Sequence, residues 1–208
     1  MSAHAEQAEG VDDDSPRRTS HARERILATA DRLFYDEGIH AVGIQRIISE
    51  SRVTRVTLYR HFASKDELVA AYLERRAQFD QEQVGTIIAT YPDDPRRALS
   101  EIASVLTRDD FAALKRGCPF INASAEFAGT HSARAQGTQI RRWHTDRLEE
   151  LLTAVGHRSP RAAAAQLMMV RTGAVVSGAL DHSPHLNEDF ITCWNTLIDD
   201  GITAERRG

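Results

Sequence analysis

Apolar residues recur at helical spacing along nearly the whole chain. In the segment that begins near residue 20, the apolar positions are three and four residues apart, as in Ile26, Leu27, Ala30, Leu33 and Phe34. Such spacing places them on one face of a helix. No stretch alternates convincingly between apolar and polar residues with the period of two that a half-buried strand requires. The sequence therefore predicts an all-α fold.

The helix signals divide the chain into segments. The first helix is expected to begin near Thr19 or Ser20, which are good N-cap residues, and Gly38 is a plausible stop. Ser64 and Glu67 form a capping box that predicts a long helix running well past residue 80. The sequence "YPDDPRR" at 91–97 is a clear break. The other expected helices are 44–51, 54–62, 98–106, 119–128, 132–155, 160–180 and 188–202.

Charge is distributed unevenly, although the net charge is only −4. Residues 1–16 hold five acids and no Lys or Arg, so we expect a disordered acidic tail there. Residues 17–65 hold ten Arg or Lys against five Asp or Glu. This asymmetry indicates an anionic partner for one part of the protein.

Several function classes lack support. The two cysteines, Cys118 and Cys193, lie within apolar helical patterns, and no Cys/His cluster has metal-ligand spacing. There is no signal-peptide pattern and no apolar run of transmembrane length. Phosphate loops, nucleophile elbows and metalloprotease motifs are also missing. We therefore expect a cytoplasmic protein that is not an enzyme, with no cofactor, no metal and no membrane partner.

The most specific feature is a pair of short helices at 44–51 and 54–62, joined by a turn of about three or four residues and preceded by a longer helix. This arrangement is typical of a helix-turn-helix, whose second helix enters the major groove of DNA. The stretch "SRVTRVTLYRHFASKDEL" interleaves cations with aromatic residues, some of which pack the module while others offer donors. The alternative is a solvated basic face on an ordinary helical bundle.

The run "VTLYRHFASKDELVAAYL" resembles the most specific signature of the TetR (tetracycline repressor) family of bacterial transcriptional regulators. The resemblance covers about residues 22–72. It implies a helix-turn-helix three-helix domain at 17–66, joined by a long helix to a ligand-binding and dimerisation domain at 67–208. It also implies a homodimer that binds double-stranded DNA at a palindromic operator.

The same resemblance places candidate DNA contacts on the second and third helices and at the start of the fourth: Arg46, Thr54, Arg55, Thr57, Tyr59, Arg60, His61 and Lys65. Three positions depart from the family pattern. Arg52 stands where glycine is usual, so we expect a looser turn, because a left-handed non-glycine residue costs about 1 kcal/mol. Ile48 and Val56 replace smaller residues, and Val56 could contact a thymine methyl group.

The last two helices suggest a dimer interface. An apolar stripe on the last helix and small residues on the preceding one could form a two-fold four-helix contact, with the candidate residues Val170, Ala174, Ser177, Phe190, Trp194, Leu197 and Ile198. The alternative is that these residues are simply core.

A ligand pocket is expected where a few polar residues interrupt apolar helices. The candidates are Phe120, Asn122, Glu126, Phe127, Trp143, His144, Met168 and Arg171. The alternative for two of them is a structural ion pair between Glu126 and Arg171.

The favoured function is a homodimeric repressor released from its operator by a small apolar or amphipathic molecule. The alternatives are an effector-independent activator, an architectural DNA-binding protein, and an all-helical enzyme.

Overall fold

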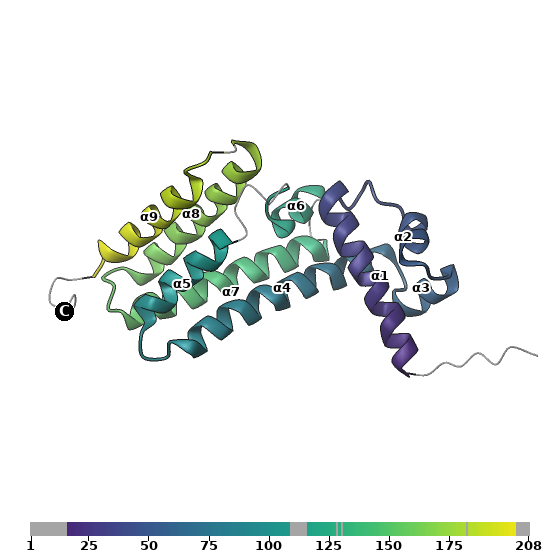
Figure 1. The fold of residues 1–208 in the computed structure, drawn as a ribbon, viewed down its shortest axis with the longest axis horizontal. Coiled ribbons are helices and arrows are strands. Elements are labelled where there is room, and N and C mark those ends of the chain that lie inside the picture. The colour runs from purple at the N-terminus through teal and green to yellow at the C-terminus, as the bar shows by residue number, and fades with distance from the viewer. Residues whose placement is uncertain (1–15, 109–115, 128, 130, 182, 203–208) are drawn as a thin grey trace, which may run out of the picture.

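The computed structural model describes residues 16–108, 116–127, 129, 131–181 and 183–202. Within these ranges the elements are all helices, apart from an isolated bridge between His157 and Ile202. The prediction of an all-α fold is confirmed. The expected acidic tail lies almost entirely outside the described residues. The molecule is elongated, with the N-terminal helices at one end and α8 and α9 at the other (Figure 1).

Three helices form the N-terminal unit: α1 (Pro16–Glu37), α2 (Ile44–Ser51) and α3 (Arg55–His61). The predicted bounds of α2 are confirmed, and α3 differs from its prediction only because Thr54 and Phe62 are its caps. The prediction for α1 was wrong by a few residues. It begins at Pro16, and proline is well suited to a first turn because its missing N–H would be unsatisfied there. The shared core includes Ile26, Leu33, Phe34, Ile47, Leu58 and Phe62.

The turn between α2 and α3 is tight, although it lacks the usual glycine. Arg52 adopts a left-handed conformation, with φ 53° and ψ 46°, and its N–H donates to the carbonyls of Ile48 and Ser49. The hydroxyl of buried Ser51 donates to the Ile47 carbonyl at 2.6 Å. The expectation of a looser turn is therefore wrong, because the backbone keeps the compact geometry that glycine would adopt.

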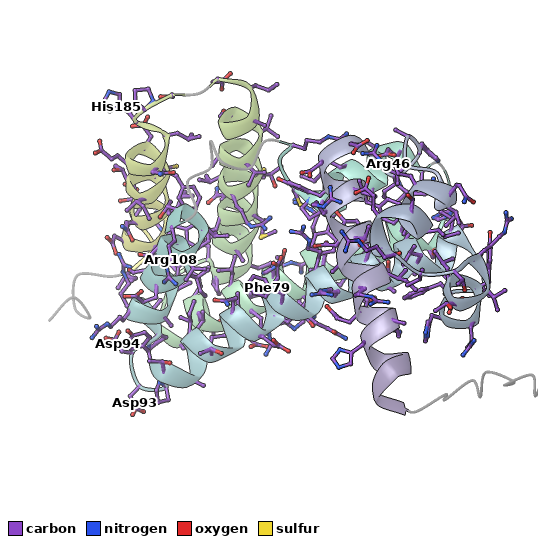
Figure 2. All side chains as sticks on the ribbon, turned by 45° about the vertical axis from the view of Figure 1, so that its right-hand side comes forward. Arg46, Phe79, Asp93, Asp94, Arg108 and His185 are labelled. Carbon is purple, nitrogen blue, oxygen red and sulfur yellow. The ribbon has the colours of Figure 1, made fainter. Side chains whose placement is uncertain are left out.

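Helix α4 (Lys65–Thr90) connects the two parts of the molecule. Its start is fixed by the predicted cap, since the Glu67 N–H donates to Ser64 Oγ at 3.1 Å. The Glu67 carboxylate accepts from the Ala63 N–H at 2.6 Å, one residue before the position expected for a capping box. With 26 residues the helix is about 39 Å long. Asp93 and Asp94 follow it, at the end opposite the N-terminal helices (Figure 2).

The C-terminal part contains five more helices, of which α5 and α7 pack against α4. Helix α7 lies along α4, α8 packs between α7 and α9, and α5 packs on α4, α7 and α9 (Figure 1). The predicted bounds of α8 are confirmed, whereas α5 is longer than predicted and α9 is shifted toward the N-terminus. The helices are α5 (Pro95–Arg108), α6 (Pro119–Glu126), α7 (Ser132–Ala154), α8 (Pro160–Leu180) and α9 (Leu186–Asp199).

Trp194 is a core residue of this part. It is fully buried within one protomer, and its indole N–H donates to the Leu99 carbonyl on α5 at 3.0 Å. Phe190 and Ile198 from the same face of α9 are also buried, as is Ala174 on α8. The prediction that these residues form a dimer interface is wrong, because they are already covered by their own protomer. Val170, Ser177 and Leu197 are only partly buried.

Helix α8 is long and apolar enough to cross a membrane by length and composition alone. In the structure it is flanked by α7 and α9, which cover part of its surface. Its large exposed apolar residues, Met169, Val176 and Leu180, lie on an outer face. Helix α8 is therefore apolar on two sides. One side packs in the core, and the rest of the chain does not cover the other.

The left-handed turn residue gives a stability prediction. We expect Arg52→Gly to raise the free energy of unfolding by about 1 kcal/mol, because glycine adopts this conformation without steric cost. The midpoint of urea unfolding measures the change. Arg142→Gly on the exposed surface of α7 is the matched control and should lower stability by about 1 kcal/mol. Equal destabilisation by both variants would contradict the assignment of strain to Arg52.

Candidate nucleic-acid interface and internal cavity

Helix α3 presents an exposed face of mixed chemistry. Leu58 and Phe62 point into the core, and this fixes the outward face as Arg55, Val56, Tyr59 and Arg60. Val56 is 71% exposed and Tyr59 is 40% exposed. The guanidinium of Arg55 lies 5.6 Å from the centroid of the Tyr59 ring. This short helix therefore offers hydrogen-bond donors and one apolar side chain to a groove of DNA.

Two threonines form the start of α3. Thr54 Oγ1 accepts from the Thr57 N–H at 3.1 Å, and the two hydroxyl oxygens are 2.8 Å apart. Their first role is thus to cap the helix and set its direction. Both were predicted to contact DNA. A contact with phosphate from this position is compatible with the cap, since each hydroxyl oxygen has more than one hydrogen-bonding direction.

Lys65 is the first residue of α4 and is half-buried beside α3. Burial lowers the pKa of its ammonium group, and the nearby carboxylates of Glu126 and Asp66 act in the opposite direction. The free backbone N–H groups at this helix start attract anions. A DNA phosphate here would complement both the ammonium group and the helix terminus. His61 is also half-buried at the end of α3.

Arg46 is engaged within the protein. Its Nε donates to Glu50 at 2.8 Å, and its guanidinium also pairs with Glu37. The hydrogen bonds that Arg46 donates to Glu50 and then to Glu37 raise its pKa. Arg32 of α1 pairs with the same Glu50 carboxylate. These acids offset the positive charge of Arg46, so the structure makes it a weaker candidate for a phosphate contact than Arg55 or Lys65.

Helix α6 connects the N-terminal unit to the C-terminal part, next to α1 (Figure 1). The carboxylate of Glu126 accepts from the backbone N–H groups of Ile39 and His40, at 3.1 Å and 2.7 Å. These two N–H groups belong to the loop that follows α1. Gly38 precedes them with φ 98°, and a Cβ atom there would lie 3.3 Å from Glu126 Oε1. The close approach of this loop to α6 therefore depends on glycine.

Two further hydrogen bonds join the same parts. The Tyr35 hydroxyl donates to the Gly117 carbonyl at 3.1 Å, and Arg116 donates to the Tyr35 carbonyl at 3.2 Å. On α4, Arg76 donates two hydrogen bonds to Asp31 of α1, at 2.6 Å and 3.1 Å. The helices of the N-terminal unit are thus connected to the C-terminal part through α6 and the segment before it, as well as through α4.

An internal cavity of about 240 Å³ lies within the C-terminal part. Its wall is mainly apolar. Phe79 on α4 lines the cavity and is also 60% exposed at the surface (Figure 2). The lining comes from six helices and the segment before α6: Arg76, Phe79, Asp80, Gln83, Val84, Ile87, Ile102, Val105, Leu106, Gly117, Cys118, Pro119, Phe120, His144, Arg147, Leu148, Met168, Arg171, Val175 and Trp194. Such a cavity can enclose a small molecule.

Half of the predicted pocket residues line this cavity, namely Phe120, His144, Met168 and Arg171. The prediction was wrong for the other four. Three of them belong to α6 or its C-cap, and α6 turns only one side toward the cavity, whereas Trp143 lies on α7 next to the lining residue His144. Asn122 donates to the Arg116 carbonyl at 2.6 Å, and Glu126 binds the loop after α1. Phe127 stacks on His131, with ring centroids 3.9 Å apart. Trp143 packs against the ring of His144 but is not part of the lining.

The alternative of a Glu126–Arg171 ion pair is also wrong, since the two side chains lie in different places. The sequence did not identify the cavity residues on α4 and α5, nor Trp194. A weak signal was present, because Val84, Ile87 and Ile88 continue the apolar pattern of α4 beyond its buried first half. Within the described ranges, no three His, Cys, Asp or Glu side chains gather where they could hold a metal ion.

Comparisons with known proteins agree with this architecture. Residues 26–72 match the model of the family described as "Bacterial regulatory proteins, tetR family". A solved structure of SCO4454, a TetR-family transcriptional regulator from Streptomyces coelicolor, is 36% identical, with a TM-score of 0.81. That likeness covers 88% of this chain and 97% of the other.

Curated relatives match only part of the chain. An HTH-type transcriptional regulator of Mycobacterium tuberculosis is 34% identical over 97 residues, which is 47% of this chain and 48% of that protein. The HTH-type transcriptional activator FasR of Mycolicibacterium smegmatis is 35% identical over 75 residues, 36% of this chain and 34% of FasR. The chain therefore spans about half the length, or less, of the curated relatives it matches.

The position of Lys65 gives a DNA-binding prediction. Lys65→Ala should weaken binding to all DNA sequences and reduce the slope of log affinity against log salt by about one unit, because a phosphate contact carries no sequence information. Fluorescence anisotropy at several salt concentrations measures the slope. Arg97→Ala, which removes an exposed cation near the far end of α4, is the control and should leave the slope unchanged. An unchanged slope for Lys65→Ala would refute the phosphate contact.

Proposed function

Since the chain belongs to the TetR family of bacterial transcriptional regulators, we propose that it is a homodimeric repressor released from its operator by a small molecule in the internal cavity. The observation that carries this proposal is the direct connection between the cavity wall and the DNA-binding helices. Arg76 lines the cavity and binds Asp31 of α1, while α6 contributes Phe120 to the cavity and Glu126 to the loop after α1. We place this activity in the cytoplasm, where the DNA is.

The cavity supports a release mechanism because it lies against the less buried half of α4. Leu68, Val69, Tyr72 and Leu73 are fully buried, whereas none of the α4 residues after Leu73 is. Helix segments with few buried contacts move at lower cost. A ligand that fits only a displaced α4 shifts the equilibrium by its difference in affinity for the two arrangements. The expected result is a changed spacing of the two α3 helices in the dimer.

Spacing matters because a dimer reads two operator half-sites. The half-sites of a palindrome lie one helical turn of DNA or a multiple apart, and the paired recognition helices must match that distance. A small displacement of α4 or α6 is therefore enough to weaken DNA binding. The sequence predicted one connection between the two parts, the long helix α4. The hydrogen bonds of Glu126 and Tyr35 add a second connection through α6 and the segment before it.

We place the dimer interface on the outer face of α8 and the adjoining surface of α9. Met169, Val176 and Leu180 are 63%, 44% and 72% exposed, and they follow one side of α8 at helical spacing. Gly173 lies between them on the same side, with nothing within 4 Å of where its Cβ atom would be. Two copies of such a face can form a self-complementary contact around a two-fold axis.

A transcriptional activator is the second candidate function. FasR, whose printed name is that of an activator, resembles this chain over 75 residues. The identity covers only a third of either chain, so it gives weaker support than the cavity and its connections give to a ligand-released repressor. An effector-independent or architectural role would not explain the presence of the cavity.

The proposed interface gives a mutational prediction. Met169→Glu should convert the dimer to a monomer, because it places two carboxylates in an apolar contact across the two-fold axis. Operator affinity should fall at least about tenfold, since the two half-sites would no longer be bound together. Sedimentation velocity and a gel shift measure both effects. Gln139→Glu on the exposed surface of α7 is the control. A Met169→Glu protein that remains dimeric would rule out this interface.

The repressor assignment is tested on a promoter. Genomic fragments bound by the purified protein identify the operator, and a reporter gene is placed behind it. Deleting the regulator should raise expression, whereas a fall would identify an activator.

Val105→Phe, which fills the cavity, should keep operator binding and prevent induction. If Val105→Phe loses DNA binding and induction together, the cavity is part of the structural core and is not an effector site.

A further inference from the structure

The internal cavity contains polar groups that its own wall does not satisfy. Arg171 Nε, His144 Nε2 and Arg147 Nε are shielded from solvent, and no hydrogen-bond partner is found for them among the described residues. All three side chains line the cavity. An arginine Nε–H can only donate a hydrogen bond, so at least two of the three atoms require an acceptor. Buried polar groups are normally paired, and a ligand that enters the cavity can supply that acceptor.

The arginines that line the cavity differ in whether an acidic side chain pairs with them. Arg76 is held by Asp31, and Arg147 pairs with Glu150 at its outer end. The described contacts give no acidic partner to Arg171, which projects from α8 between the apolar residues Met168 and Val175. Arginine cannot lose its charge by deprotonation, so a cation in such an apolar wall requires an anion.

Among the lining residues that the structure describes, Asp80 is the one carboxylate, and it follows the exposed Phe79 on α4. Its Oδ2 is 3.6 Å from His144 Nε2, and its side chain is 30% exposed. Solvent therefore screens the charge of Asp80. A cationic ligand could instead pair with Asp80, but that would leave Arg171 without an anion. The apolar position of Arg171 favours an anionic ligand.

We propose that the effector is a small amphipathic molecule with one carboxylate-type anionic group, which binds the guanidinium of Arg171. The planar guanidinium offers parallel N–H donors that match the two oxygens of a carboxylate. The apolar part of the ligand lies against Phe79, Val84, Ile87, Ile102, Val105 and Leu106. This inference rests on the proposed role of the cavity as the effector site.

The size of the cavity limits the ligand. A cavity of about 150 Å³ is sufficient for benzene. At about 240 Å³, this cavity suits a medium-chain fatty acid or a substituted aromatic acid. Decanoate is a suitable probe because 1-decanol and decylamine have the same chain with a neutral and a cationic head group. The three molecules differ mainly in the charge that Arg171 would recognise.

The test compares these three probes in the full-length protein. Trp194 lines the cavity and Trp143 does not, so Trp143→Phe leaves one tryptophan as the reporter. Decanoate should bind at least about tenfold more tightly than 1-decanol or decylamine, as judged by Trp194 fluorescence and by calorimetry on the unmodified chain. Equal or tighter binding of the alcohol or the amine would overturn the proposal without any further variant.

Two variants of the arginine complete the test. Arg171→Met should weaken decanoate binding about tenfold or more and leave 1-decanol binding unchanged, while Arg171→Lys should retain part of the preference for the acid. Arg142→Met on the exposed surface of α7 is the matched control. Undiminished decanoate binding in a folded Arg171→Met protein would also overturn the proposal. If Arg171→Met does not fold, the comparison of the three probes decides.

Operator release is measured separately, so that the two proposals can fail independently. Decanoate that binds through Arg171 without releasing the DNA fragment supports the ligand class and contradicts the release mechanism. Release of DNA by 1-decanol or decylamine, with decanoate inactive and unbound, supports the release mechanism and overturns the anionic ligand.

Discussion

Helix α4 contributes both to the core around the N-terminal helices and to the wall of the internal cavity, and this limits how either part of the protein can move. The first turns of α4 bury Leu68, Val69, Tyr72 and Leu73, and its later residues form one wall of the internal cavity. Because a helix is stiff along its axis, we propose that a displacement at the cavity wall also moves Lys65. The cap made by Ser64 and Glu67 holds the DNA-proximal end of this helix in place.

Helix α6 makes the connection more specific. Glu126 binds two backbone N–H groups that have no helical partner after α1 ends, and these bonds hold only while α6 keeps its place. Tyr35 and Arg116 add hydrogen bonds between the same two parts, and Arg76 joins α4 to α1. The junction is therefore mainly polar and directional. Directional contacts break over small displacements, whereas apolar contacts tolerate sliding, so a polar junction suits a switch.

The N-terminal unit was largely predictable because its signals are local. The bounds of α2 could be predicted from the capping residues, the spacing of apolar residues and the position of the turn. The same signals placed each end of α3 within one residue. Even Arg52 could be identified as the strained position, although its effect on the turn was misjudged, since hydrogen bonds from its N–H hold the left-handed geometry. The cavity was only half predicted. Its wall combines residues from six helices, and no local pattern shows which sides of those helices meet.

The sequence by itself determined the helical period, the chain breaks, the basic helix-turn-helix and the outward donors of α3. Those features depend on neighbours a few residues apart. Only the tertiary structure decided which apolar faces are core and which are free. Trp194 and Met169 both lie on apolar stripes, yet Trp194 is fully buried against α5 and Met169 is 63% exposed. The fold likewise separated Glu126 from Arg171, because α6 turns the acid toward α1 while α8 turns the arginine into the cavity.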